Sequence, residues 1–359
     1  MLKDMIDRFA VGVEGHFPNA LLAQPTLRPL YADRYGGSGG AFHGGSGRCV
    51  HDSIFIMKGS GPTALVPNDV SRAYRHGYLQ MSQAIKQTIM SRVAQALFPY
   101  SAVPVLALID TGYDFDFDEN GRDERAAIVV RENFLRVAHL ERSLFFGDAG
   151  YPGPDQSEDA LRVKATIEFV AQKYQLHTSQ KALQFLIDWL DIVCRQFGFA
   201  RASRLWGDYL VSSNLCLDGR WCDLELFQTL PHWGRGRNQV NNVFGAEAAS
   251  ILNTFKSLKF YFSKYAVIER NAKMPISNTN EIEAKIEEFF LDDCTRLLFE
   301  ERPNEMVKQR AQKLILSIYS AEQTFSYDAA KIDGIEIGFG EPLKKLIDGL
   351  VEELKAVIS

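Results

Sequence analysis

The stretch Phe55-Ile-Met-Lys-Gly-Ser-Gly-Pro-Thr63 decides the fold class that we expect for this chain of 359 residues. The apolar, β-branched run that opens it predicts a short buried strand over residues 53–57. Two glycines and a proline then interrupt the extended pattern. Lys58 stands at this break, so the end of the strand presents a positive charge next to a sharp turn.

A glycine-rich segment precedes the strand. Residues 36–47 contain seven glycines, and the cluster ends as Gly44-Gly-Ser-Gly-Arg48. Glycine lacks a Cβ, so backbone N–H groups in such a loop can approach phosphate oxygens closely. A plain surface loop is the alternative. The candidate phosphate-binding residues are Gly45, Gly47, Arg48, Lys58 and Gly59.

The segments downstream predict one helix and two further strands. Apolar residues at spacings of three and four predict a helix over residues 71–97, and Pro99 ends it. Apolar runs over 103–109 and 125–130 predict strands, and the acidic loop 114–123 joins them as a hairpin. We therefore expect residues 1–145 to form an α+β lobe with an antiparallel sheet, and residues 1–35 to be the leader segment of this lobe.

The remainder of the chain changes to a helical pattern. Asp218-Gly219 forms a turn dipeptide between two short apolar stretches and predicts a tight hairpin that ends near Asp223. We expect residues 146–359 to form a mainly helical second lobe that carries this hairpin. The predicted helices cover residues 160–174, 179–197, 245–271, 279–300, 303–321 and 341–358.

The composition excludes several classes of function. The formal net charge of −5 argues against a nucleic-acid partner, which normally meets a basic surface. The sequence contains no apolar run long enough to cross a membrane, and its first residues lack the apolar core of a signal peptide. Its five cysteines follow no regular framework, which is typical of a reducing compartment. We therefore expect a cytoplasmic protein without membrane partners.

Two pairs of polar residues are candidates for binding a polyphosphate and its cation. Asn214 and Asp223 flank the predicted hairpin, so their oxygens can approach one Mg²⁺ or Mn²⁺, a cation that often keeps few protein ligands beside phosphates. Arg131 and Arg136 follow the strand at 125–130, and guanidinium groups bind phosphate oxygens in pairs. Ordinary turn residues and surface ion pairs are the alternatives for these four side chains.

The order of these segments resembles the selenoprotein O (SelO) family of kinase-like protein AMP-transferases. It is more similar still to the MchC-like relatives of that family, which act in bacterial microcin maturation. The likeness runs from about residue 30 to residue 225. The segments that carry it are Gly44-Gly-Ser-Gly-Arg48, Phe55-Ile-Met-Lys-Gly-Ser-Gly-Pro-Thr63, Val129-Val-Arg-Glu-Asn-Phe-Leu-Arg-Val-Ala-His139 and Ser212-Ser-Asn-Leu-Cys-Leu-Asp-Gly-Arg-Trp-Cys-Asp223.

The resemblance implies a two-lobed protein-kinase-like fold that binds ATP and a divalent cation. It implies that Lys58 contacts phosphates, that Arg131 and Arg136 hold phosphates of an inverted nucleotide, and that Asn214 and Asp223 bind the metal. An inverted ATP presents its α-phosphate to the acceptor, which implies transfer of AMP to a protein or ribosomal peptide. Transfer of phosphate is the less favoured alternative. The resemblance also implies that the chain acts together with a partner enzyme in peptide maturation.

The sequence also departs from the kinase-like pattern. The glutamate that should pair with the strand lysine aligns with Arg92, and Ser213 replaces the aspartate that should precede Asn214. These changes favour a pseudokinase scaffold as a second hypothesis. A third is a small-molecule kinase in which Asp208, six residues before Asn214, acts as the base. His139 is expected to cap or pack near Arg136 without a catalytic role.

Overall fold

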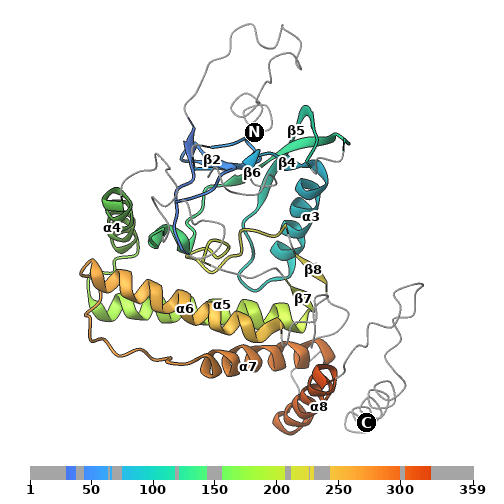
Figure 1. The fold of residues 1–359 in the computed structure, drawn as a ribbon. Coiled ribbons are helices and arrows are strands. Elements are labelled where there is room, and N and C mark those ends of the chain that lie inside the picture. The colour runs from blue at the N-terminus through green and yellow to red at the C-terminus, as the bar shows by residue number, and fades with distance from the viewer. Residues whose placement is uncertain are drawn as a thin grey trace, which may run out of the picture. The chain divides into compact units, whose positions relative to one another are not determined.

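The computed structural model describes residues 30–37, 44–63, 65–66, 75–117, 121–143, 156–206, 212–225, 227–229, 243–299 and 304–324. Within them the chain is α+β, with an antiparallel sheet and a large helical part (Figure 1), as the sequence predicts. Asp208, most of the predicted leader and the helix expected at 341–358 lie outside the described residues.

The main sheet has six strands in the described part of the chain. The order of hydrogen-bonded neighbours is β1-β2-β3-β6-β4. Strand β5 lies off this path and also pairs with β6. Each pairing is antiparallel, and β5 with β6 forms the hairpin predicted from the two apolar runs around the acidic loop. The strands are β1 (Tyr31–Ala32), β2 (Cys49–His51), β3 (Phe55–Lys58), β4 (Leu79–Gln80), β5 (Val105–Phe115) and β6 (Glu124–Glu132).

Strand register places the cations on one face of the sheet. Lys58 pairs with Val129, and Ile56 pairs with Arg131. Because side chains alternate along a strand, Lys58 and Arg131 lie on the same face, whereas Met57 packs with residues of the opposite face. The sheet thus brings a lysine and an arginine, more than seventy positions apart in the sequence, to one surface.

Helix α3 (Met81–Leu97) packs on this face and is shorter than predicted. The sequence predicts one helix over residues 71–97, but β4 (Leu79–Gln80) pairs with β6 and interrupts it; residues 71–74 lie outside the described residues. Gly77 explains the late start, because its φ is +69° and an added Cβ would lie 2.2 Å from the carbonyl carbon of Gly61. The close crossing of these two segments excludes a helical turn there.

The buried face of α3 also differs from the predicted apolar stripe. Ile85 and Ile89 are exposed, although their spacing predicted burial. The buried positions are Ala84, Gln87, Ser91 and Ala94. The helix therefore directs small and polar side chains toward the sheet, because Gln87 contacts Asp223 and Ser91 contacts the Val103 carbonyl oxygen there.

The later helices confirm most of the predicted segments. They are α4 (Gln156–Lys173), α5 (Ser179–Ala202), α6 (Val243–Lys264), α7 (Thr279–Leu298) and α8 (Glu305–Thr324); the short 3-10 helix η1 covers Val137–Leu140 and the strands β7 and β8 cover Leu205–Trp206 and Gln228–Thr229. Asn278 caps α7 by accepting a hydrogen bond of 3.0 Å from the Glu281 N–H. The predicted end of α6 at 271 is wrong, because the helix stops at Lys264.

None of the helices in the described ranges has the length and apolar character needed to cross a membrane.

The chain divides into two compact units. The first comprises residues 1–192, 210–227 and 253–275, and the second comprises 193–209, 228–252 and 276–359. The first unit thus runs through the expected boundary at residue 145 and also contains the hairpin near Asp223. A division into kinase-type lobes stays a prediction.

Candidate functional site

The hairpin that carries Asp223 is fixed in the first unit by backbone pairing. Leu215 pairs with Trp221 across the predicted Asp218-Gly219 turn, and the Cys222 N–H donates to the Asn214 carbonyl oxygen at 3.1 Å. Outside the hairpin, the Val137 N–H donates to the Leu215 carbonyl oxygen at 2.9 Å. This last bond ties the hairpin to the segment that follows β6, which is the segment that holds Arg136.

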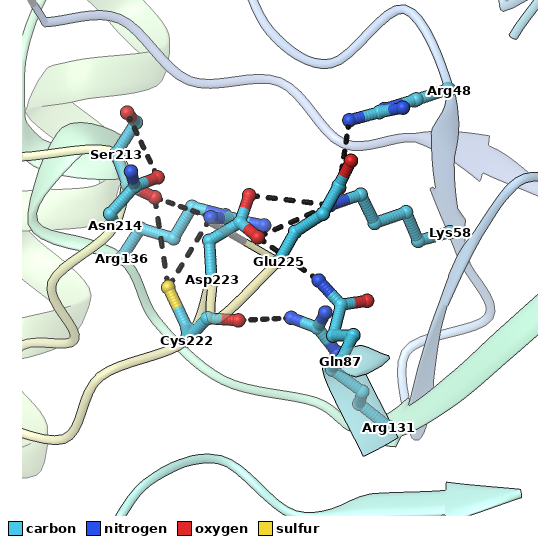
Figure 2. Close-up of polar contacts among 10 residues, drawn as sticks. All are labelled: Arg48, Lys58, Gln87, Arg131, Arg136, Ser213, Asn214, Cys222, Asp223 and Glu225. Carbon is cyan, nitrogen blue, oxygen red and sulfur yellow. Dashed lines mark hydrogen bonds and ion pairs between the residues drawn. The ribbon is translucent and has the colours of Figure 1, made fainter. Parts of the chain in front are cut away.

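Lys58 meets two carboxylates of the hairpin. Its ammonium group lies 3.2 and 3.3 Å from the two oxygens of Asp223 and 2.6 Å from Oε2 of Glu225. The same Glu225 oxygen accepts a hydrogen bond of 3.2 Å from Arg48 in the glycine-rich segment. Figure 2 shows Asp223 and Glu225 reaching toward Lys58 from the hairpin. The structure thus brings Arg48, Lys58 and Asp223 together, as a shared site requires.

The two predicted arginines lie next to these carboxylates. Arg131 donates to the backbone carbonyl of Cys222, and Arg136 donates to the backbone carbonyl of Ser213 and to the sulfur of Cys222. Both guanidinium groups are buried. The Nε and Nη2 atoms of Arg131 have no hydrogen-bond partner within the described residues, so this cation retains donors for an anionic ligand.

Arg136 belongs to a buried network with His139 and Asp33. The Arg136 N–H donates to Nδ1 of His139 at 2.8 Å, and Nε2 of His139 lies 2.9 Å from Asp33. Asp33 in turn lies 3.5 Å from Nε of Arg136. Burial by itself would raise the pKa of Asp33, but His139 and Arg136 more than offset it and lower this pKa to about 2. His139 therefore packs near Arg136, as predicted.

Asn214 lies at the open end of the hairpin, on the side of Asp223 away from Lys58 in the view of Figure 2. Its Oδ1 accepts a hydrogen bond of 3.5 Å from the Ser213 hydroxyl. Asn214 is only partly buried, whereas Ser213 is buried. We call Arg48, Lys58, Arg131, Arg136, Asp223 and Glu225 the cluster. Asn214 shares the hairpin with Asp223, and the role of these two residues as metal ligands stays a prediction.

The described end of the glycine-rich segment, residues 44–47, is packed against other parts of the chain. The Ser46 N–H donates to the Asp33 carbonyl oxygen at 2.9 Å, and a Cβ on Gly45 would lie 2.2 Å from that same oxygen. A Cβ on Gly47 would lie 2.8 Å from a methyl group of Val66. Close packing thus explains these two glycines, and their contact with phosphates stays a prediction.

Arg92, which aligns with the expected partner of Lys58, does not face this site. Arg92 is exposed on α3, and the side chain that reaches the cluster from this helix is Gln87, whose Nε2 donates to Oδ1 of Asp223 at 3.0 Å. Gln87 and Glu225 are the residues that our sequence analysis missed as site residues. No local pattern in the sequence marks either residue, because Glu225 contacts Lys58 across 167 positions and Gln87 contacts Asp223 across 136.

The cations of the cluster keep both hairpin carboxylates ionised. Burial opposes ionisation of Asp223, but Lys58 and Arg131, together with Arg136 and Arg48, hold the pKa of this carboxyl group far below its usual value. Burial likewise opposes ionisation of Glu225, and Lys58 and Arg48 lower its pKa nonetheless. The site therefore presents charged carboxylate oxygens at neutral pH.

The donor set is suited to a polyphosphate with a hard cation. In the described part of the chain, no group of three or more His, Cys, Asp or Glu side chains is arranged to hold a metal ion by itself. Asp223 and Asn214 supply carboxylate and amide oxygens, and Mg²⁺ takes few such protein ligands when phosphates and waters complete its shell. Two guanidinium donors of Arg131 have no partner among the described residues, and guanidinium donors are of the kind that bind phosphate oxygens.

No model of a known protein family matches the chain, and a search of curated proteins found no match. Every side chain of the cluster, from Arg48 to Glu225, belongs to the first compact unit.

Proposed function

We propose that the cluster around Lys58 and Asp223 binds ATP with Mg²⁺ or Mn²⁺, and that the chain transfers AMP or phosphate to a protein or peptide. The observation that carries the proposal is the meeting of Lys58 from β3 with Asp223 from the hairpin at 3.2 Å, beside a buried arginine with spare donors. A strand lysine, an aspartate for the metal and a neighbouring asparagine are the parts that kinase-type phosphoryl transfer uses. The proposal includes a kinase-like fold for the chain.

The roles of the residues follow from their charges. Asp223 and Asn214 would hold the cation, and Lys58, Arg131 and Arg136 would neutralise phosphate charge that increases during transfer. ATP with its cation supplies the activated phosphoanhydride. Since such transfer depends mostly on positioning and charge neutralisation, Ser213 in place of an aspartate does not exclude activity.

The acceptor is expected to be a hydroxyl or carboxylate group of a protein or ribosomal peptide, and the reaction would belong to peptide maturation alongside a partner enzyme. This part of the proposal rests on the resemblance to the SelO and MchC-like proteins. Incubation of the chain with ATP labelled at the α- or the γ-phosphate, in a lysate that contains the acceptor, distinguishes AMP transfer from phosphorylation. Label from the α position that disappears in Asp223→Asn would support AMP transfer.

Nucleotide binding is tested by calorimetric titration with ATP at a fixed Mg²⁺ concentration. We expect the wild-type chain to bind, and Asp223→Asn to lose at least about 10-fold in affinity because a charged metal ligand is replaced by a neutral one. Asp218→Asn is the matched control: it lies in the same hairpin, is exposed, and contacts Arg220 at 2.8 Å rather than Lys58. Absence of binding by the folded wild-type chain would refute the proposal.

A pseudokinase is the second candidate, and one observation favours it. Lys58 already has two carboxylate partners, Asp223 and Glu225, so a cation must displace it from Asp223. A pseudokinase scaffold would bind nucleotide, or the partner protein alone, without transfer. Labelling of an acceptor that depends on Asp223 would contradict this reading, whereas binding without any label transfer would favour it.

A further inference from the structure

The carboxylate nearest to Lys58 comes from the hairpin and not from the helix above the sheet. In protein kinases, the strand lysine is anchored by a glutamate on that helix. Here α3 contains no acidic residue along its whole length, from Met81 to Leu97. The group that Lys58 approaches most closely is Oε2 of Glu225, at 2.6 Å.

We propose that Glu225 is the positioning residue that anchors Lys58 while nucleotide is bound, so that the hairpin supplies both the metal-binding carboxylate and the lysine anchor. This inference rests on the function proposed above and names a residue that neither the kinase pattern nor the resemblance assigns. It also removes the objection that Lys58 has lost its partner through Arg92.

The choice of Glu225 over Asp223 follows from their contacts. Asp223 lies farther from the lysine, at 3.2 Å and 3.3 Å, and also accepts a hydrogen bond from Gln87. Its side chain is 30% exposed, against 13% for Glu225, so Asp223 is the more open of the two to a cation. When a cation binds Asp223, Glu225 remains as the carboxylate partner of Lys58.

The local chain geometry explains how one short segment performs both tasks. Leu224, which separates the two acids, is 2% exposed and points into the core. Asp223 and Glu225, on either side of this buried residue, both direct a carboxylate to Lys58 (Figure 2). Glu225 also binds Arg48 at 3.2 Å, so the anchor links β3 to the glycine-rich segment that precedes it.

The position of Gln87 offers a direct test by transplantation. Its amide nitrogen and the Lys58 ammonium contact the same oxygen of Asp223, so the two groups are neighbours. Its own Oε1 is buried and has no hydrogen-bond partner among the described residues. A glutamate at position 87 would return the anchor to the helix, where kinases carry it.

The experiment compares four proteins: wild type, Glu225→Gln, Gln87→Glu and the double variant. ATP affinity in Mg²⁺ and the midpoint of thermal unfolding are measured for each. Glu225→Gln should bind ATP at least about 10-fold more weakly and unfold about 4 °C lower, because two cations lose their carboxylate. Gln87→Glu alone should not strengthen binding, since it crowds a third acid near Asp223. The double variant should bind ATP to within about threefold of wild type.

Glu168→Gln is the matched control, because it makes the same substitution in an exposed ion pair on α4, where Lys164 lies 3.7 Å away. This control should change neither the ATP affinity nor the midpoint of thermal unfolding. The proposal that Glu225 anchors Lys58 would be overturned if Glu225→Gln bound ATP as tightly as wild type. It would also be overturned if the folded double variant bound ATP no better than Glu225→Gln.

Failure of the anchor can be separated from failure of the proposed function. If the folded wild-type chain binds no ATP, the proposed function fails, and the thermal midpoints alone then judge the anchor. Recovery of the midpoint in the double variant supports it, and no recovery refutes it. If Glu225→Gln does not fold, folding of the double variant counts as support and its failure to fold counts against the anchor.

Discussion

Arg131 and Arg136 are both buried next to the hairpin, yet their surroundings differ. Arg136 lies 3.5 Å from Asp33 and stacks near two aromatic rings, at 5.1 Å from Tyr35 and 4.9 Å from Phe134. Burial would lower the pKa of Arg136, but Cys222, Tyr35 and Asp33 raise it well above its ordinary value. Arg131 keeps two donor atoms without a partner in the described ranges. We therefore assign Arg136 mainly to structure and Arg131 mainly to ligand binding.

Substitution by methionine should separate these two roles. Arg136→Met should lower the free energy of unfolding by about 3 kcal/mol, because Asp33 is left as a buried charge without this cation. Arg131→Met should leave that free energy within about 1 kcal/mol of wild type while weakening ATP binding at least about 10-fold. Urea denaturation and calorimetry measure the two quantities. Equal destabilisation by both substitutions would contradict the assignment.

At the scale of single elements, the end of β3 depends on close backbone approach. Gly59 has a φ of +96°, and an added Cβ would lie 2.4 Å from the Ala127 carbonyl oxygen of β6. Its N–H donates to the Arg48 carbonyl oxygen at 2.9 Å. This packing holds Lys58, one position earlier, at the edge of the site.

Alanine substitution at two glycines tests this packing. Gly59→Ala should lower the free energy of unfolding by about 3 kcal/mol, since it combines an unfavourable φ with a backbone clash. Gly121→Ala is the control: its φ of +75° is similar, but no described atom lies within 4 Å of the added Cβ, so about 1 kcal/mol is expected. Equal losses in urea denaturation would show that φ alone matters.

Helix α3 shows at the same scale why hydrophobic periodicity failed in part. Its strongest apolar stripe includes Ile85 and Ile89, which are exposed, while Gln87 and Ser91 are buried. Ser91 donates to the Val103 carbonyl oxygen at 3.0 Å, and Gln87 donates to Asp223. Polar groups contributed by distant segments decide which face of this helix is buried, and a local pattern does not contain them.

At the scale of the whole molecule, the second compact unit has buried charges of its own. Arg201 of α5 is fully buried and contacts Glu283 of α7 at 2.7 Å. Glu247 of α6 is also buried, and its Oε2 has no hydrogen-bond partner in the described part of the chain. Burial raises the pKa of Glu247 well above its ordinary value of 4.5; Arg201 lowers it and Glu283 raises it further. At a pH between 4.5 and the raised pKa, the folded protein therefore binds a proton at Glu247 more strongly than the unfolded chain does.

This difference in bound protons predicts the pH dependence of stability. Between 4.5 and the raised pKa of Glu247, the folded state binds more protons than the unfolded state, so the free energy of unfolding falls as pH rises. Glu247→Gln should remove this slope and raise the free energy of unfolding by about 1 kcal/mol at pH 8, with little change at pH 4. Urea denaturation across this pH range measures it. A variant that is less stable than wild type at pH 8 would show that Glu247 is ionised in the folded protein.

Much of the fold could be predicted from the sequence. Apolar runs predicted β3, β5 and β6, the Asp218-Gly219 turn predicted the hairpin, and helical periodicity predicted α4, α5 and α7. These features depend on neighbours within a few positions, so a local pattern is sufficient to find them. Lys58 and Asp223 could likewise be selected because each stands directly at the end of such an element.

Tertiary structure alone decided how the cluster is connected. Glu225 contacts Lys58 across a separation of 167 positions, and Gln87 contacts Asp223 across 136. A glutamine within a helix and a glutamate after a hairpin look like ordinary surface residues in the sequence, because their partners are absent from the local pattern. Only strand register and the packing of α3 bring these side chains into contact, and those depend on the whole chain. The sequence thus determined which charged residues stand at element ends, and the fold determined which of them became partners.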